Sequence, residues 1–254
     1  VDNGLCSLGL VGLIDPPRQE AIEAVKTCRA ARIQVKMITG DHAVTAQAIG
    51  KQLGLAHGSV LTGTQLDALS DDELKQAVQT TDIFARTTPE HKLRLVMALQ
   101  SLGLTVSMTG DGVNDAPSLK RADAGVAMGL KGSEAAKEAA EVVLADDNFA
   151  SIAAAVEQGR TVYANIKKVV SWTLPTNAGE ALTIIVAMLA GLPYPITPVQ
   201  ILWVNMITAV TLGMALAFEP TDKDTMKKPP RPRGQALIQP CLLYTSPSPR
   251  DQCL

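Results

Sequence analysis

The sequence predicts an α/β protein in which an incomplete parallel sheet, with helices on both faces, is followed by an α-helical transmembrane hairpin. Two observations support this fold class. Short apolar runs alternate with amphipathic helix patterns over residues 1–160, and repeated βα units of this length form parallel sheets. Residues 169–218 then carry a single charge, that of Glu180, although 19% of the whole chain is charged.

The overall composition narrows the class of function. The 254 residues have a formal net charge of −2, and no basic run lies outside the flanks of the apolar region, so we expect no nucleic-acid partner. The four cysteines have no CxxC spacing, which argues against a zinc site or a disulfide framework. The first residues show neither an initiator Met nor a secretory signal pattern, so the chain looks cut at its front.

The elements of the first 160 residues follow from apolar runs and their boundaries. Pro16 and Pro17 cannot continue a strand but suit the start of a helix. Ser70 and Glu73 have the spacing of a capping box, which predicts a helix after them. The expected order is strand 8–14, helix 19–32, strand 35–38, helix 44–53, helix 71–79, strand 83–85, helix 89–102, strand 105–108, helix 116–122, strand 125–127, helix 133–140 and strand 142–144.

The apolar region predicts two membrane helices over about 169–192 and 199–218. Each is long enough to cross a bilayer, which takes roughly 20 residues. Basic residues flank the pair on both sides, so both flanks can face the cytoplasm. A pair of buried helices in a soluble protein is the alternative. Residues 219–238 are expected to form a cytoplasmic loop, and the aperiodic tail over 239–254 is expected to be non-native.

The densest chemical signal is the string TGDGVND over 109–115. It follows directly after a predicted strand, where ligands of parallel sheets bind. Asp111, Asn114 and Asp115 bring hard oxygen ligands to one strand end, and such ligands suit Mg²⁺ beside a phosphoryl group. The alternative is a surface turn, because Asp-Gly pairs favour turns.

Two further segments could handle phosphate. Thr39, Gly40 and Asp41 follow another strand, where a hydroxyl and a backbone N–H can bind phosphoryl oxygens. Lys92 lies in the first turn of a helix, and its charge could offset a phosphoaspartate, whereas His91 is expected at the surface. Together these elements resemble the haloacid-dehalogenase-like phosphotransferases. That chemistry needs an Asp nucleophile in a D-K-T-G-T string, which this sequence lacks, so the chain alone is expected to be inactive.

Over about residues 5–235 the chain resembles P-type cation-transporting ATPases, most closely the type II group that contains calcium pumps. The resemblance implies the C-terminal part of the phosphorylation domain over 1–160 and the fifth and sixth membrane helices within 161–218. The motifs that carry it are DPPR (15–18), MITGD (37–41), ARTTPEHK (85–92), TGDGVNDAPSLKRADAGVAMG (109–129) and VVLADDN (142–148).

The resemblance implies roles for the residues around the phosphoryl group. Asp111 would ligate Mg²⁺, and Asp115 would help to hold the metal and the phosphate region. Asn114 would orient phosphoryl oxygens, and Thr39 and Lys92 would contact the phosphoryl group.

The same resemblance implies contacts at the nucleotide. Gly40 would bring its backbone close to the phosphoryl group, and Asp41 would act beside the preceding hydroxyl. Asp15 and Arg18 would face ATP near a hinge, and Arg86 would add a contact at that interface. Mg²⁺ and ATP are therefore the expected cofactors.

Polar residues inside the apolar region predict a site for a transported cation. A carboxylate at the centre of a membrane helix costs about 2.5–3.5 kcal/mol, so Glu180 tends to mark an ion path. Asn177 lies three residues before it, and Asn205 and Thr208 repeat this spacing in the second helix. The alternative is that these groups only join the helices. Calcium pumps have an Asp where this chain has Ala209, which leaves the ion open.

The leading hypothesis is thus an ATP-driven cation pump that works through an aspartyl-phosphate, with calcium as the first candidate ion. It would be an integral membrane protein with a cytoplasmic phosphorylation domain, and the plasma membrane is its expected location. Its partners would be the transported cation, membrane lipid and its own nucleotide domain, actuator domain and further membrane helices. The alternatives are a soluble haloacid-dehalogenase-like phosphatase and an inactive membrane-anchored regulatory protein.

Overall fold

The computed structural model describes residues 16–55 and 59–237, which form two compact units. The first unit consists of residues 16–26 and 34–150, and the second of residues 27–33 and 151–237. The strand expected over 8–14, Asp15 and the tail over 239–254 lie outside the described residues.

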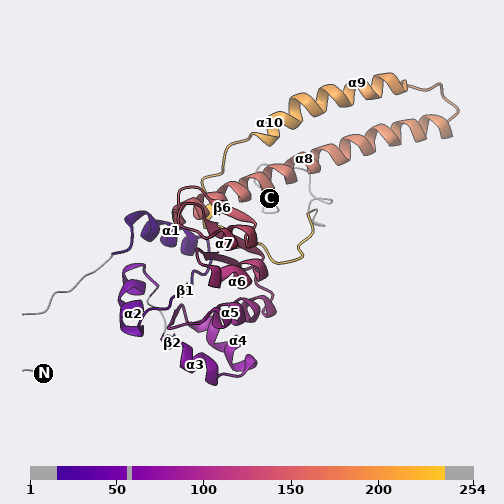
Figure 1. Ribbon diagram of the computed structural model, residues 1–254. Coiled ribbons are helices and arrows are strands. Elements are labelled where there is room, and N and C mark those ends of the chain that lie inside the picture. The colour runs from indigo at the N-terminus through magenta and orange to yellow at the C-terminus, as the bar shows by residue number, and fades with distance from the viewer. Residues whose placement is uncertain (1–15, 56–58, 238–254) are drawn as a thin grey trace, which may run out of the picture. The chain divides into compact units, whose positions relative to one another are not determined.

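The first unit contains two three-stranded sheets, with strand orders β1-β3-β2 and β4-β5-β6 (Figure 1). All pairs are parallel, as the alternation of strands and helices predicts. In the first sheet Ile83 is aligned with both Met37 and Val60. The strands are β1 (Met37–Ile38), β2 (Val60–Thr62), β3 (Ile83–Ala85), β4 (Ser107–Gly110), β5 (Ala124–Met128) and β6 (Val142–Leu144).

The helices begin and end within a few residues of their expected bounds. The capping box of Ser70 and Glu73 is present at the start of α4, where the Ser70 hydroxyl accepts the N–H of Glu73. Strand β2 and helix α3 were not predicted, because both are too short for a clear apolar period. The helices are α1 (Gln19–Ala30), α2 (Ala43–Gln52), α3 (Gly63–Ala68), α4 (Asp71–Thr80), α5 (Pro89–Ser101), the 3₁₀ turn η1 (Val113–Asp115), α6 (Ala116–Arg121) and α7 (Glu134–Ala139).

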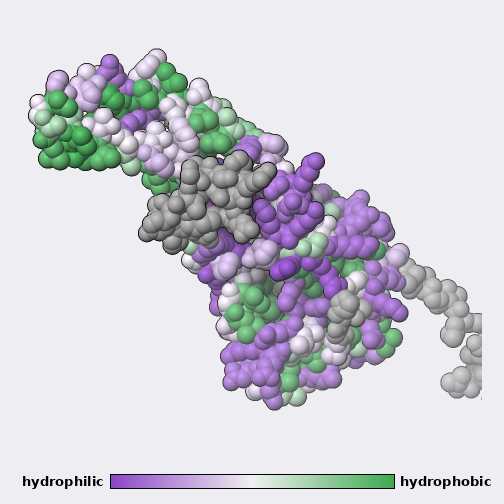
Figure 2. All heavy atoms as spheres, turned by 180° about the vertical axis from the view of Figure 1, so that it is seen from behind, coloured by the Kyte–Doolittle hydropathy of each residue, from purple (hydrophilic) through white to green (hydrophobic). Residues whose placement is uncertain are grey.

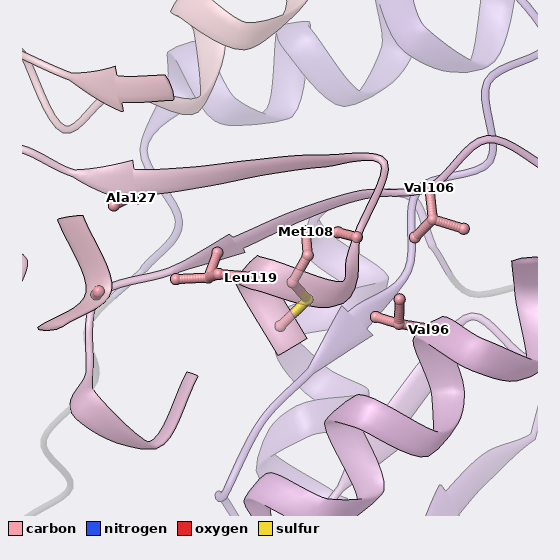
Figure 3. Packing of buried hydrophobic residues seen from close by; sticks show 7 residues of the cluster. Val96, Val106, Met108, Leu119 and Ala127 are labelled. Atoms are coloured by element: carbon pink, nitrogen blue, oxygen red, sulfur yellow. The ribbon is translucent and has the colours of Figure 1, made fainter. Parts of the chain in front are cut away.

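The core of the first unit lies against both sheets. One cluster joins α5, β4, α6 and β5 through buried side chains that include Val96, Met108 and Leu119 (Figure 3). A second cluster gathers around Phe84 of β3. Ile38 of β1 packs against both clusters, so it lies close to the residues that pack on β4. Within the described ranges β1 pairs only with β3, and β4 only with β5, so each sheet has an edge strand in this part of the core.

The second unit is built on a helical hairpin. Helix α8 (Phe149–Leu189) has 41 residues and continues through Pro175, so it begins about 20 residues before the expected start of a membrane helix. No strong helix breaker separates residues 149–168 from the apolar part, which explains the longer helix. The return helix consists of α9 (Pro198–Thr208), the π turn η2 (Ala209–Gly213) and α10 (Met214–Ala217).

One stretch in the described part of the chain, Pro198–Ala217, is long and apolar enough to cross a membrane, with a mean hydropathy of 1.7. Its residues are not buried within the protein. Figure 2 shows hydrophobic side chains gathered on the hairpin. The apolar part of α8 contains Asn177 and Glu180, which lower its hydropathy.

The end of α10 and the segment after it are bonded to the first half of α8 by side chains along that helix. The bonds are Asn165 Nδ2 to Ala217 O (3.1 Å) and Glu219 O (2.8 Å), Lys168 Nζ to Glu219 Oε2 (2.8 Å), Thr161 Oγ1 to Thr221 Oγ1 (2.9 Å), and Arg160 Nη1 to Thr225 O (2.9 Å) and Lys228 O (2.8 Å). This segment is therefore ordered by α8 rather than by a helix or strand of its own, apart from the short turn η3 (Thr225–Lys227).

Candidate functional site

The end of β1 forms a small closed loop. The Thr39 hydroxyl donates to Asp41 Oδ2 (3.0 Å) and accepts the N–H of Asp41 (3.1 Å). The N–H of Thr39 is bonded to the carbonyl of Phe84 (2.9 Å), which ties this loop to β3. Gly40 and Asp41 are exposed, so the backbone of the loop is accessible to a ligand.

The end of β3 is joined to the same loop. The N–H of Arg86 donates to the carbonyl of Asp41 (3.1 Å). The N–H and the hydroxyl of Thr87 both donate to the carbonyl of Thr39 (each 3.1 Å). Arg86 has a φ of 50°, a left-handed conformation that is unfavourable for a residue with a Cβ. Such a residue persists where several contacts fix it, and these hydrogen bonds supply the contacts.

Helix α5 places the positively charged side chain of Lys92 at the end of β4. Thr88 caps the helix and Pro89 occupies its first position, so Lys92 lies in the first turn. Its ammonium group donates to Asp115 Oδ1 at 2.6 Å. The other oxygen of Asp115 accepts the N–H groups of Asp111 (3.3 Å) and Gly112 (3.2 Å). Because Asp115 is only 4% exposed and both its oxygens are bonded, it fixes this loop and the lysine together.

The loop after β4 presents its other polar groups outward. The side chains of Asp111 and Asn114 are exposed. A Cβ at Gly110 would come within 2.6 Å of the Asp115 Cβ, so a glycine is needed for the close approach. The carbonyl of Asp111 accepts the N–H of Ser133 (2.8 Å), which ties this loop to the start of α7. The backbone that carries the exposed Asp111 carboxylate is therefore fixed by hydrogen bonds to Asp115 and to Ser133.

The donor set fits a magnesium ion that is bound mainly through water and phosphate. No group of three or more His, Cys, Asp or Glu side chains that could enclose a metal occurs among the described residues. Asp111 offers a free carboxylate, whereas Asp115 is engaged by protein donors. Mg²⁺ commonly keeps several waters and binds through one or two carboxylates plus substrate phosphates. The site therefore suits that ion.

The structure gathers the predicted phosphoryl-site residues into two bonded groups. Thr39, Asp41 and the Arg86 backbone form one, and Lys92, Asp115 and the loop of Asp111 form the other. Arg18 is exposed just before α1, and Asp15, which was also expected to face ATP, lies outside the described residues.

The position of His91 differs from the prediction. It was expected at the surface, but it is only 6% exposed, and its Nε2 lies 2.7 Å from Asp67 Oδ1. The reason is that its ring occupies the third position of α5, where the side chain of a capping box folds back on the N-cap. The T-x-x-H spacing from Thr88, with His in place of Glu or Gln, is the signal that could have revealed it.

The polar residues of the hairpin are only partly brought together. The amide of Asn205 donates to Glu180 Oε2 (3.0 Å), which joins the two helices. The Thr208 hydroxyl donates to the carbonyl of Val204 in its own helix (2.6 Å), and Asn177 is exposed. The π turn begins at Ala209, directly after these residues, and such turns occur frequently at functional sites.

Comparison with known proteins decides the family. A model described as haloacid dehalogenase-like hydrolase matches residues 6–123, and one described as cation transporting ATPase, C-terminus, matches residues 193–246. A probable cation-transporting ATPase F of Mycobacterium tuberculosis is 54% identical over 244 residues, which cover 94% of this chain and 27% of that protein. The chain belongs to the family of P-type cation-transporting ATPases.

Other P-type relatives agree over the same extent. A calcium-transporting ATPase of Bacillus subtilis is 50% identical over 232 residues, 91% of this chain and 26% of that protein. An endoplasmic reticulum calcium ATPase of Aspergillus fumigatus is 46% identical over 250 residues, 96% of this chain and 26% of that protein. The chain thus spans about a quarter of the length of these P-type ATPases, and its α/β unit has the haloacid-dehalogenase-like fold.

Proposed function

We propose that this chain forms the phosphoryl-binding part and one membrane hairpin of an ATP-driven cation pump that passes through an aspartyl-phosphate. The Lys92–Asp115 pair beneath the exposed carboxylate of Asp111 is the observation that carries this proposal. It holds a positive charge and a metal-binding oxygen at the end of one strand, which is the arrangement that stabilises a phosphoryl group during transfer.

The acceptor Asp would stand on a further strand between β1 and β4. Each of these strands forms an edge of its sheet within the described residues, and Ile38 packs against the core cluster that includes Met108. A parallel strand inserted there would end between Thr39 and the loop of Asp111, because the carboxyl ends of parallel strands meet at one edge. The sequence itself contains no D-K-T-G-T string, so we propose that another part of the full polypeptide supplies it.

Each of the predicted site residues then has a place in the reaction. The Lys92 ammonium would offset the charge of the phosphoryl group, and the Thr39 hydroxyl and the Gly40 N–H would bind its oxygens. Asn114 would orient the same oxygens. Asp111 would hold Mg²⁺, which when bound supplies charge neutralisation at the phosphate. Arg18 and Arg86, together with Asp15, would face ATP.

The hairpin would form part of the cation path. Glu180 and Asn205 already contact each other across the two helices, and Asn177 and Thr208 would add oxygen ligands. Calcium is the first candidate ion, because several relatives are named calcium-transporting ATPases. Ala209 leaves the two helices with a single carboxylate, which favours one bound divalent ion rather than two. This role requires a membrane, with the first unit on the cytoplasmic side, and we place the pump in the plasma membrane.

The test is phosphoenzyme formation by the full-length protein that contains this chain. Asp111→Asn should abolish phosphorylation by ATP because it removes the exposed metal-binding carboxylate, whereas Asp72→Asn, on the exposed face of α4, should leave it intact. Glu180→Gln should retain phosphorylation by inorganic phosphate but change its cation dependence, with Glu157→Gln on the same helix as control. Normal phosphorylation of Asp111→Asn would reject the assignment of the site, and an unchanged ion response would show that Glu180 is not a ligand.

A further inference from the structure

The ring of His91 joins the first turn of α5 to α3. Its Nδ1 accepts the N–H of Thr88 at 3.1 Å. A nitrogen that accepts a hydrogen bond is unprotonated, so the proton of the neutral ring is on Nε2. Nε2 therefore donates to Asp67 Oδ1 at 2.7 Å, which lies at the end region of α3.

Three other capping boxes in the described part of the chain show that a cap alone does not need this ring. Gln65 in α3, Glu73 in α4 and Gln200 in α9 occupy the same helix position and accept the N–H of their N-cap residues. Each of these side chains caps the start of its own helix. His91 caps α5 through Nδ1 and bonds to Asp67 of α3 through Nε2, so it has a role beyond capping.

The turn that His91 holds is the turn that presents Lys92. The N–H of Lys92 donates to the carbonyl of Thr88 (3.2 Å), and its ammonium group meets Asp115. The ring also packs tightly against α3, because a Cβ on Gly63 would come within 3.1 Å of His91 Cε1 and would clash with the carbonyl of Arg86. The position of the lysine is thus coupled to α3 through a buried and closely packed ring.

We propose that His91 and Asp67 are positioning residues for Lys92 in phosphoryl transfer. The pair ties the start of α5 to α3, and this link sets where the ammonium group stands relative to Asp115 and the phosphoryl group. The inference rests on the proposed function, because it assigns the pair to the same reaction. Neither residue contacts the phosphoryl site itself, so both act through the lysine.

The test compares variants of the full-length protein that separate capping from positioning. His91→Gln keeps an acceptor for the Thr88 N–H but is too short to bridge to Asp67, and Asp67→Ala removes the partner. Both should slow phosphoenzyme formation about tenfold at an unchanged KM for ATP, which lies within the hundredfold that a 1 Å misplacement can cause. Asp67→Asn keeps an acceptor for Nε2–H and should restore most of the rate, and Asp72→Ala on α4 is the matched control.

A double variant distinguishes positioning from general stability. In a Lys92→Ala background, His91→Gln should cause no further loss, because the group that it positions is absent. Urea unfolding of each variant shows that the folded protein is being measured. A wild-type rate in His91→Gln, or an additional loss in the Lys92→Ala background, would overturn the inference while leaving the proposed function standing. A wild-type protein that forms no phosphoenzyme would overturn both.

Discussion

The two units hold their polar groups in different ways. At the strand ends of the first unit, both oxygens of Asp115 are bonded, and the Thr39 hydroxyl is a donor and an acceptor at once. In the hairpin, Glu180 accepts one bond from Asn205, and Asn177 is exposed. The proposed phosphoryl site is thus fixed by backbone hydrogen bonds and a buried ion pair, whereas the polar groups of the hairpin make fewer hydrogen bonds.

This difference corresponds to the proposed chemistry. Transition-state stabilisation requires groups that are already in place, because reorganising them during the reaction would cost free energy. A transported ion must be bound and then released, so its ligands need to change their arrangement. A rigid strand-end site and a loosely bonded helix pair suit these two tasks.

The largest expected effect tests the buried pair of the first unit. Lys92→Met leaves the Asp115 carboxylate without its cation at a position where that side chain is 6% exposed. Removing one partner of a buried ion pair costs about 3–5 kcal/mol, and the partial exposure of Lys92 places the loss near the lower end. Urea unfolding of the chain in detergent measures it.

The matched control for this prediction lies in the second unit. The Lys168–Glu219 pair has side chains that are 30% and 42% exposed, so Lys168→Met should cost less than about 1 kcal/mol. Equal losses of unfolding free energy in the two variants would contradict the proposal that polar groups are held more firmly in the first unit than in the second.

Glycines give a second, smaller test of the same difference. Gly110→Ala would force a Cβ to within 2.6 Å of the Asp115 side chain, and overpacking of this kind costs roughly 1–3 kcal/mol. Gly159 in α8 has no atom within 4 Å of an added Cβ, so Gly159→Ala should stabilise that helix by up to about 1 kcal/mol. Thermal unfolding should show a lower Tm for Gly110→Ala and a higher Tm for Gly159→Ala than for the wild type. A higher Tm for Gly110→Ala would contradict the crowding of the loop.

Much of the first unit can be predicted from sequence because its signals are local. The capping box of Ser70 and Glu73, the prolines before α1 and the polar string after β4 each act within a few residues. Strand β3, predicted over 83–85, has those bounds in the structure. The phosphoryl-site residues are contiguous in three short motifs, so they could be named before any contact was known.

The rest depends on contacts between residues far apart in the chain. His91 and Asp67 are 24 residues apart, and nothing in the local pattern of either residue reveals the other. The division into two sheets arises from which strands pair, which alternation alone does not determine. The length of α8 was not predicted, because its first half is more polar than the apolar run at which the expected membrane helix starts.

The smallest expected effect concerns pH at a loop beside the phosphoryl site. Burial of Asp147 raises the pKa of its carboxyl, but the backbone N–H groups of Leu130, Lys131 and Gly129 outweigh that effect and hold the pKa below its usual value. A lowered pKa in the folded state means that the loop is stabilised above the unfolded pKa of about 3.9, and that this stabilisation is lost as the pH falls through the folded value. The amide signals of Leu130 and Lys131 in an NMR titration should therefore shift with a midpoint below that of an ordinary Asp. Asp147→Asn should abolish this titration, and a midpoint at or above the ordinary value would show that the amides do not hold the charged carboxylate.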